Sequence, residues 1–495
     1  MPQPILIVGA GPVGLTLAVE LTRFGVPVRI VDRAAVRTDK SKALVLWSRS
    51  LELMDRTGET SAFLAAGMRS GGANILAKGR QLGRVSFTTE GTPYPFALMI
   101  PQSETERLLE EHLAARGVTV GRQVELIRFT PGADGVEAVL RGVDGSEETV
   151  QAPWMIGCDG AHSAVRHGLG MAFEGDTLPS QWVLADVHLK GLPTAPDELA
   201  LFWHADGVLA LFPISPGRYR MIADIGETSD GTARPDPTLE EVQDLLDRRG
   251  QPGMVASDPI WLAGFRINER KVKSYSAGRV FLAGDAAHIH SPAGGQGMNT
   301  GMQDAFNLAW KLALVVQGKA AAEPLLESYS IERSAVGDIV LSNAGRMTAV
   351  ATLRGSAKQT LRNLMASLVL HVPAIRRVMG RTLSELTIAY PQSPLTVPGG
   401  RHSGGPAAGD RMPPRPGEPP IGAGDTPRFA LFAEASPEAT ELLARYGALM
   451  EATPRAPIAP GAMWLVRPDG YVALVAKAGE WAEIEGYLGR LVAKG

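Results

Sequence analysis

The sequence predicts an α/β protein: a parallel sheet interrupted by an antiparallel sheet, followed by a helical region and a small α/β module. Three observations predict this fold: a strand–turn–helix–strand unit at the N-terminus, repeated strand patterns over residues 171–275, and a second strand-to-helix turn near residue 285. We therefore divide the 495 residues into four parts: 1–170, 171–275, 276–397 and 398–495.

The N-terminal unit has the pattern of a dinucleotide-binding turn. Ile5–Val8 are four branched aliphatic residues, which predict a buried parallel strand. Gly9, Gly11 and Gly14 follow with the spacing G-x-G-x-x-G and lead into a helix predicted over residues 12–24. The first glycine permits a sharp turn, the second lets a pyrophosphate approach the backbone, and the third allows close helix packing. A second strand then ends at Asp32, where the motif expects a carboxylate for a ribose hydroxyl.

Composition excludes several classes of protein. The chain has a net charge of −3, with 45% hydrophobic and 20% charged residues, so we expect no nucleic-acid partner and no anionic membrane partner. No apolar run reaches the roughly 18–20 residues of a membrane span. Cys158 is the only cysteine, so no intrachain disulfide forms. The N-terminus lacks a basic leader, and we expect a cytoplasmic protein.

The rest of the first part alternates helices with short strands. We expect helices at residues 48–54 and from residue 101. A strand-like, turn-rich segment is expected at residues 80–95, and short strands at residues 118–120, 123–129 and 135–140. A buried strand at residues 154–157 ends in Cys158-Asp159-Gly160, a second turn rich in small residues.

Residues 171–275 have the pattern of an inserted antiparallel sheet with one helix at residues 239–247. The predicted strands are residues 182–189, 199–204, 207–214, 219–226 and 260–267. Apolar and aromatic residues in this sheet are candidates for a substrate cavity, although ordinary core packing explains each one equally well: Trp203, Phe212, Tyr219 and Met221.

The second strand-to-helix turn is the most specific signal. A strand at residues 278–283 ends in Gly284-Asp285, and a glycine-rich loop over residues 291–301 leads into a helix predicted at residues 302–316. Because glycine costs conformational entropy, this density implies that the backbone approaches a ligand closely. The helix N-terminus suits an anionic group, or a ring that gains negative charge on reduction.

The remaining chain is expected to be helical over residues 320–390. Residues 398–427 are rich in Gly and Pro and form a connecting segment. From residue 429 onward, strand, helix and turn patterns predict the small α/β module.

These motifs together resemble the FAD-dependent aromatic hydroxylases, the single-component flavoprotein monooxygenases of the p-hydroxybenzoate hydroxylase and phenol 2-monooxygenase type. The resemblance spans nearly the whole chain and is strongest over residues 281–310. It implies a Rossmann-like FAD-binding domain in two parts, with an inserted antiparallel substrate domain. The C-terminal module resembles the thioredoxin-like domain of the phenol hydroxylase branch, but it lacks Cys-x-x-Cys, so we assign it no redox role.

The resemblance also implies an activity. NAD(P)H, with NADPH favoured, would reduce the FAD, and a hydroperoxide at flavin carbon 4a would hydroxylate a phenolic or polycyclic, polyketide-like aromatic substrate. Only one G-x-G-x-x-G is present, so the hydride donor would bind transiently. The expected partners are the small aromatic substrate and dioxygen, and the expected assembly is a monomer or homodimer.

Residue roles carry over from the same resemblance. The residues implied in FAD binding are Gly9, Gly11, Pro12, Val13, Gly14, Asp32, Arg33, Lys42, Ala43, Gln102, Arg107, Val124, Asp159, Gly160, Gly284, Asp285, Pro292, Gly295, Gly297, Met298 and Asn299. Lys42 departs from the arginine that the family usually has, which keeps the charge but loses the planar fork.

The catalytic candidates fall into two groups. The resemblance implies Pro292, Gly294 and Gly295 beside the reacting ring. Deprotonation of a phenol could fall to Arg218 or Tyr219, and Arg220 and His204 are further candidates.

Other functions fit the sequence less well. His288 and His290 with Asp285 could suggest a metal, but histidines at i and i+2 point apart, so we expect none. A halogenase should show Trp-x-Trp-x-Ile-Pro, which is absent, while a dehydrogenase or reductase of the same architecture stays open. A non-catalytic FAD-binding relative is disfavoured by the intact loops.

Overall fold

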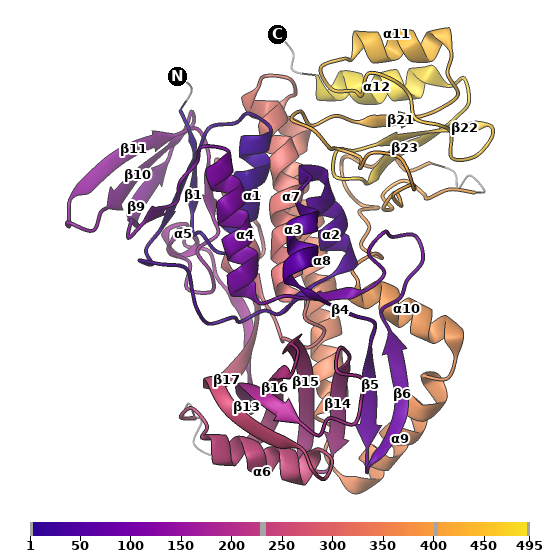
Figure 1. Cartoon of the computed structure of the whole chain (residues 1–495). Coiled ribbons are helices and arrows are strands. Elements are labelled where there is room, and N and C mark those ends of the chain that lie inside the picture. Colours follow the sequence, from indigo (N-terminus) through magenta and orange to yellow (C-terminus); the bar gives the residue numbers. More distant parts are fainter. Residues whose placement is uncertain (1–2, 228–233, 400–403, 493–495) are drawn as a thin grey trace.

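The computed structural model describes residues 3–227, 234–399 and 404–492 (Figure 1). Its first layer is a six-stranded sheet in the order β18-β19-β12-β1-β2-β8. All neighbouring strands are parallel except β18, which is antiparallel to β19. The bounds are β1 Ile5–Val8, β2 Val28–Asp32, β8 Gly121–Arg122, β12 Met155–Gly157, β18 Ser276–Ala277 and β19 Val280–Leu282. The predicted α/β class is confirmed. The two predicted strand-to-helix turns, after β1 and after β19, are also present.

Two helices pack together beside this sheet because glycines let them approach. The helices α1 (Pro12–Arg23) and α7 (Gly297–Val316) contact each other. A Cβ atom on Gly284 or on Gly301 would lie 2.7 Å from the Cγ2 atom of Val13, so no side chain fits at either position. The predicted helix at residues 302–316 begins five residues earlier, because Gly297 and Gly301 are tolerated where packing and not propensity sets the boundary.

The second layer is an eight-stranded sheet in the order β20-β17-β13-β16-β15-β14-β5-β6. It is antiparallel except between β14 and β5, and α6 (Leu239–Arg249) covers one face. The bounds are β5 Gly72–Ala77, β6 Arg80–Ser86, β13 Glu174–Lys190, β14 Leu199–His204, β15 Gly207–Ser215, β16 Arg218–Glu227, β17 Val255–Lys271 and β20 His288–Ile289. The five predicted strands are present, and the sheet also recruits β5, β6 and β20 from outside residues 171–275.

Smaller elements complete the first part of the chain. Strands β9, β10 and β11 form an antiparallel sheet, and β3, β7 and β4 form another. The strand predicted at residues 118–120 is wrong: pairing with β2 begins only at Gly121. The bounds are β3 Val45–Leu46, β4 Met68–Ser70, β7 Ala97–Met99, β9 Glu125–Pro131, β10 Val136–Arg141, β11 Glu147–Ala152, α2 Ser48–Met54, η1 Asp55–Thr57, α3 Thr60–Ala66, α4 Gln102–Ala115, α5 Ala164–Gly168 and η2 Gly284–Ala286.

The helical region and the C-terminal module follow. The helices are α8 Ala322–Ala351, α9 Ser356–Val369 and α10 Pro373–Leu383, and the module contains β21 Ala430–Phe432, α11 Pro437–Arg445, β22 Ala462–Val466, β23 Val472–Lys477 and α12 Trp481–Leu491. The buried Arg467 guanidinium donates to both carboxylate oxygens of Glu332 on α8, at 2.6 and 2.9 Å. This buried ion pair fixes the module to the helical region. The thioredoxin-like kinship of the module stays a prediction.

No helix in the described part of the chain is long and apolar enough to cross a membrane.

Candidate functional site

A cavity of about 370 Å³ lies where the first-strand turn, the glycine loop and one face of the eight-stranded sheet meet. It brings together six separate stretches of the sequence. Its lining residues are Gly11, Pro12, Val13, Lys42, Ala43, Leu44, Val45, Gln102, Cys158, Gly160, Phe212, Arg220, Ile222, Asp285, Ile289, His290, Ser291, Pro292, Gly295, Gly297 and Met298. Most of the predicted cofactor residues therefore share one cavity.

The three glycines of the first turn have different structural roles. A Cβ atom on Gly9 would lie 2.4 Å from the backbone oxygen of Cys158, and one on Gly14 would lie 2.0 Å from the oxygen of Gly9. Both glycines are therefore required by the packing of the protein itself. A Cβ atom on Gly11 would have no protein atom within 4 Å, although Gly11 lines the cavity. This open space beside the backbone fits a pyrophosphate group.

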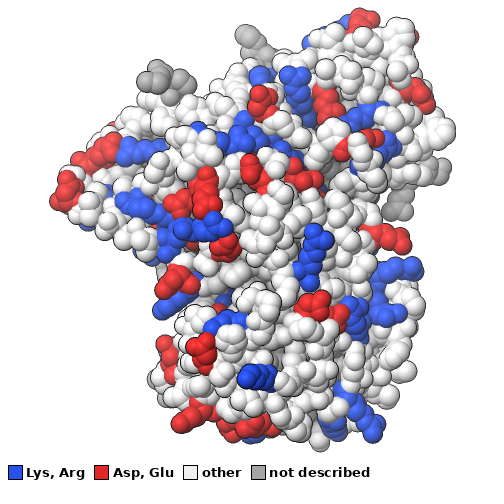
Figure 2. Space-filling view, viewed as in Figure 1, with Lys and Arg blue, Asp and Glu red and all other residues white. Residues whose placement is uncertain are grey.

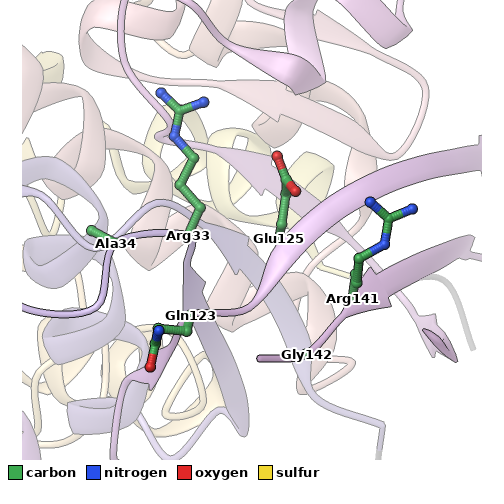
Figure 3. A pocket seen from close by; sticks show the side chains of 6 residues that line it. All are labelled: Arg33, Ala34, Gln123, Glu125, Arg141 and Gly142. Carbon is green, nitrogen blue, oxygen red and sulfur yellow. The ribbon is translucent and has the colours of Figure 1, made fainter. Parts of the chain in front are cut away.

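Asp32 stabilises the turn at the end of β2. Its Oδ2 atom accepts a hydrogen bond from the backbone N–H of Ala10 at 2.7 Å, and its Oδ1 atom accepts one from Ala34 at 2.8 Å. Each carboxylate oxygen can accept a further bond, so these contacts leave capacity for a ribose hydroxyl. The neighbouring Arg33 lines a separate open hollow, where Figure 3 shows Glu125 standing between Arg33 and Arg141. The other residues of this hollow are Ala34, Gln123 and Gly142.

Asp285 presents a carboxylate to the cavity without a protein partner. Among the described residues, its side chain makes no hydrogen bond or ion pair. Desolvation by the surrounding protein raises the pKa of this carboxyl, and the nearby His288 and Lys42 oppose that shift. An unsatisfied acceptor on the cavity wall fits a ligand that carries hydroxyl groups, such as a ribityl chain.

The N-terminus of α7 also faces the cavity. The first backbone N–H of the helix with an intrahelical acceptor belongs to Thr300, which donates to Gln296 at 2.8 Å. Gly297 and Met298 precede it and line the cavity, so their N–H groups and the positive end of the helix suit developing negative charge. The buried Asn299 side chain instead binds the backbone of Val45 and Trp47 at 2.8 Å each, and so it positions β3 and does not reach the cavity.

His290 is a cavity residue that the sequence suggested only as a metal ligand. Its Nδ1–H donates to the backbone oxygen of Ser291 at 2.8 Å, which leaves Nε2 as a buried acceptor without a partner among the described residues. Burial and the neighbouring His288 lower the pKa of His290 to about 4, so the imidazole is neutral. His288 points elsewhere, with Nε2 2.8 Å from Asp304. The described residues contain no group of three or more potential metal ligands.

The cavity wall on the sheet is made by alternate residues of β15 and β16. Phe212 pairs with Arg220, and Ile222 lies two residues further along the same face. Tyr219 and Met221 point to the opposite face and pack beneath α6, where the Tyr219 hydroxyl donates to the oxygen of Pro196 at 2.9 Å. Both are predicted as cavity residues from the sequence, and the structure places them on the other face of the sheet, outside this cavity. The alternation of side chains along β16 could have identified Arg220 and Ile222.

The other candidates on this sheet also lie away from the cavity. Trp203 is buried in the core, with the Arg362 guanidinium 4.4 Å from its ring centroid. The Arg218 Nη2 atom donates to Asp258 Oδ2 at 2.7 Å near the surface, and His204 lies beside Asp206. Of the predicted substrate residues, only Phe212 lines the cavity.

Several predicted cofactor residues have scaffold contacts. The Gln102 N–H donates to the Ala43 oxygen at 2.9 Å, and both residues line the cavity. The Arg107 guanidinium is held by Glu104 and Glu111 on its own helix, outside the cavity lining. The other predicted residues make contacts around the turns: the Asp159 carboxylate accepts from the Val165 N–H at 3.2 Å at the start of α5, the Val124 N–H donates to the backbone oxygen of Asp32, and the Gly284 N–H donates to the Asp304 carboxylate. The backbone oxygen of the catalytic candidate Gly294 accepts from Trp47 Nε1.

Comparison with known proteins shows the cofactor class of the chain. A family profile described as the FAD binding domain matches residues 3–344. The chain is 38% identical to 6-methylpretetramide 4-monooxygenase of Streptomyces rimosus, covering 95% of this chain and 90% of that protein. It is 33% identical to pentachlorophenol 4-monooxygenase of Sphingobium chlorophenolicum, covering 83% and 75%. The solved structure of OxyS anhydrotetracycline hydroxylase from Streptomyces rimosus covers 100% of both chains at 30% identity, with a TM-score of 0.79.

Proposed function

The chain belongs to the FAD-dependent aromatic hydroxylase family and is an FAD-dependent aromatic monooxygenase, and from that premise we propose that it hydroxylates a polycyclic, polyketide-like aromatic substrate. One observation carries the proposal: the dinucleotide turn, the glycine loop and the apolar sheet residues Phe212 and Ile222 line a single cavity. The 38% identity to a pretetramide monooxygenase over 95% of the chain favours a polycyclic ring system. A small phenol is the second candidate, favoured by the pentachlorophenol monooxygenase match.

The open positions in the cavity support a set of proposed FAD contacts. Gly11, Pro12 and Val13 hold the pyrophosphate at the start of α1, and Asp285 accepts a hydrogen bond from the ribityl chain. The N–H groups of Gly297 and Met298, at the start of α7, would stabilise the ring edge that becomes negative on reduction. Pro292 and Gly295 line the same cavity and would lie beside the ring.

When bound, FAD supplies hydride acceptance and oxygen activation, and the protein positions the reactants and excludes water. Phe212 and Ile222 form the apolar wall against which the aromatic substrate lies. His290 also lines the cavity as a neutral imidazole and would border the bound substrate, although its Nε2 atom is itself buried. Arg220 does not act as the base, because its guanidinium is paired with Asp186.

Further assignments rest on the family and the composition. NADPH is the proposed hydride donor and binds transiently, since the chain has one G-x-G-x-x-G. The protein is proposed to act in the cytoplasm as a monomer or homodimer, and the four parts of the chain are proposed as its domain divisions.

The test is a substrate panel scored for oxygenated product. Purified holoenzyme is incubated with NADPH, oxygen and either simple phenols or tetracyclic aromatic polyketides, and products are identified by mass. The expected result is an added oxygen atom in a polycyclic compound, with NADPH consumption coupled to product. Turnover of simple phenols alone would favour the second candidate, and NADPH-dependent reduction without oxygen insertion would contradict both.

A further inference from the structure

The surface of α9 and α10 has an inverted distribution of side chains. On α9, the apolar residues Leu361, Leu364 and Leu368 share one helical face and are 61%, 57% and 60% exposed. The polar residues Gln359 and Arg362 point inward instead and are only 9% and 8% exposed. Other apolar residues of these two helices and their connection do pack on the core, among them Ala366, Leu370 and Leu383. The exposed leucines of α9 are therefore additional apolar surface that is free to contact something outside the chain.

Hydrogen bonds fix the inverted orientation. The Gln359 side chain donates to the backbone oxygens of Leu353 at 2.9 Å and Ala205 at 3.1 Å. Arg362 donates to the backbone oxygens of Val350 and Ala351, both at 3.2 Å. These buried contacts would be lost if α9 rotated to hide its leucines, so the exposed apolar face is a stable feature.

The apolar surface continues through the turn into α10. Figure 1 shows α9 and α10 (orange) at the outer edge of the molecule, beside β5 and β6. We name the whole surface the α9–α10 face, defined by exposed apolar residues on both helices and their connection: Leu361, Leu364, Met365, Leu368, Val372, Ile375 and Val378. So many exposed apolar side chains along one edge are typical of an interaction site.

The segment that carries this face is rich in cations and contains no carboxylate. Residues 339–384 contain seven Lys and Arg residues but no Asp or Glu. Within the described residues, five of these cations have no hydrogen bond or ion pair: Arg346, Lys358, Arg376, Arg377 and Arg381. In Figure 2, the lower right rim of the molecule, where α9 lies, carries blue and white surface. The overall charge of −3 conceals this local positive field.

We propose that the α9–α10 face docks on an anionic lipid surface, with its apolar residues in the headgroup boundary and its cations on the lipid phosphates. A second copy of the chain is a less suitable partner for the α9–α10 face. A two-fold pairing would bring the face against itself, and the five unpaired cations would meet cations with no carboxylate between them. This surface attachment needs no membrane-spanning helix.

The docked helices also contact the cavity loop. A Cβ atom at Gly294 would lie 3.4 Å from Leu383 on α10 and 3.7 Å from Met347 on α8. Gln296 donates to the backbone oxygen of Thr382 at 3.0 Å. Lipid contact at α10 is therefore joined to the glycine loop by direct packing.

Vesicle co-sedimentation of the FAD-loaded enzyme tests the proposal. We expect binding to phosphatidylglycerol vesicles, little binding to phosphatidylcholine vesicles, and release when salt rises from ~0.1 M to ~0.5 M. The double variants Leu364→Gln/Leu368→Gln and Arg377→Glu/Arg381→Glu should each lower binding at least tenfold. The controls Val143→Gln and Lys273→Glu change exposed residues elsewhere and should bind normally.

Light scattering on the same samples separates the alternatives. Equal binding to both vesicle types, no binding to either, or unchanged binding by the two double variants would each overturn the proposal. A dimer in solution that Leu364→Gln/Leu368→Gln splits, without vesicle binding, would instead identify the face as an interface between copies. None of these outcomes bears on the monooxygenase activity, which is assayed separately.

Discussion

Arg220 donates a hydrogen bond from its Nη1 atom to the backbone oxygen of Lys42, 3.2 Å away. The same guanidinium donates to both carboxylate oxygens of Asp186 on the neighbouring strand, at 2.8 and 2.7 Å. Arg220 therefore connects the eight-stranded sheet to the segment that carries Lys42, and both residues line the cavity. The distance between the FAD loops and the substrate wall depends on this contact.

Replacing Arg220 with lysine should loosen that connection. Lysine keeps a positive charge beside Asp186, but it lacks the planar guanidinium that binds both carboxylate oxygens and the backbone oxygen of Lys42. We therefore expect a raised KM for the aromatic substrate and a loss of roughly 1–3 kcal/mol in the free energy of unfolding. Steady-state kinetics and thermal unfolding measure both effects. Arg218→Lys is the control, because Arg218 pairs with the exposed Asp258 and should change stability by less than about 0.5 kcal/mol. Equal behaviour of the two variants would refute the connection.

Gly11→Val should abolish FAD retention without unfolding the protein. The new side chain enters a space that holds no protein atom within 4 Å of the Cβ position, which is where we place the pyrophosphate. The ratio of flavin to protein absorbance after purification gives the occupancy. Gly486→Val on α12 is a matched control, since a Cβ atom there also meets nothing within 4 Å. Full FAD occupancy in Gly11→Val would show that the pyrophosphate does not bind at this turn.

Asp285→Ala should weaken FAD binding by roughly ten- to a hundredfold. The carboxylate has no protein hydrogen bond to lose, so the change removes only the bond to the ligand, worth on the order of 1–3 kcal/mol. Titration of the apoprotein with FAD measures the dissociation constant. Asp134→Ala on an exposed loop is the control. An unchanged constant in Asp285→Ala would exclude the ribityl contact.

Ile222 and Met221 are adjacent on β16 but should respond oppositely to alanine. Ile222 lines the cavity, so Ile222→Ala should raise the substrate KM or change substrate preference while most stability remains. Met221 is fully buried beneath α6, so Met221→Ala should cost about 2–5 kcal/mol of unfolding free energy with little change in KM. The reverse result would show that the substrate lies on the other face of the sheet.

Glu385→Gln should flatten the dependence of stability on pH. Glu385 is fully buried beside α7, where it accepts a hydrogen bond from Thr300 at 3.0 Å, and desolvation raises its pKa from 4.5 to about 8. Between these values the folded state binds more protons than the unfolded state, so this group's stabilisation is lost as pH rises toward 8. We expect wild-type melting temperatures to fall more steeply from pH 5 to pH 8 than those of Glu385→Gln. Parallel curves would show that Glu385 is ionised throughout.

The sequence by itself determined the parallel unit, the two glycine turns and the family. Those features depend on local rules: branched aliphatics for a buried strand, and glycine where backbone packs on backbone, as at Gly9 and Gly14. These local rules do not depend on residues that are distant in the chain.

Tertiary structure alone decided the substrate wall and the partners of the cavity residues. Tyr219 and Ile222 belong to one strand, and only its packing between α6 and the cavity determines which face the substrate can reach. His290 became a free acceptor because its Nδ1–H is used by Ser291, and α9 exposes its leucines because Gln359 and Arg362 bind distant backbone oxygens. The Gln359 contact with Ala205 joins residues far apart in the chain, and packing against distant elements decides the two faces of β16, so neither leaves a local pattern in the sequence.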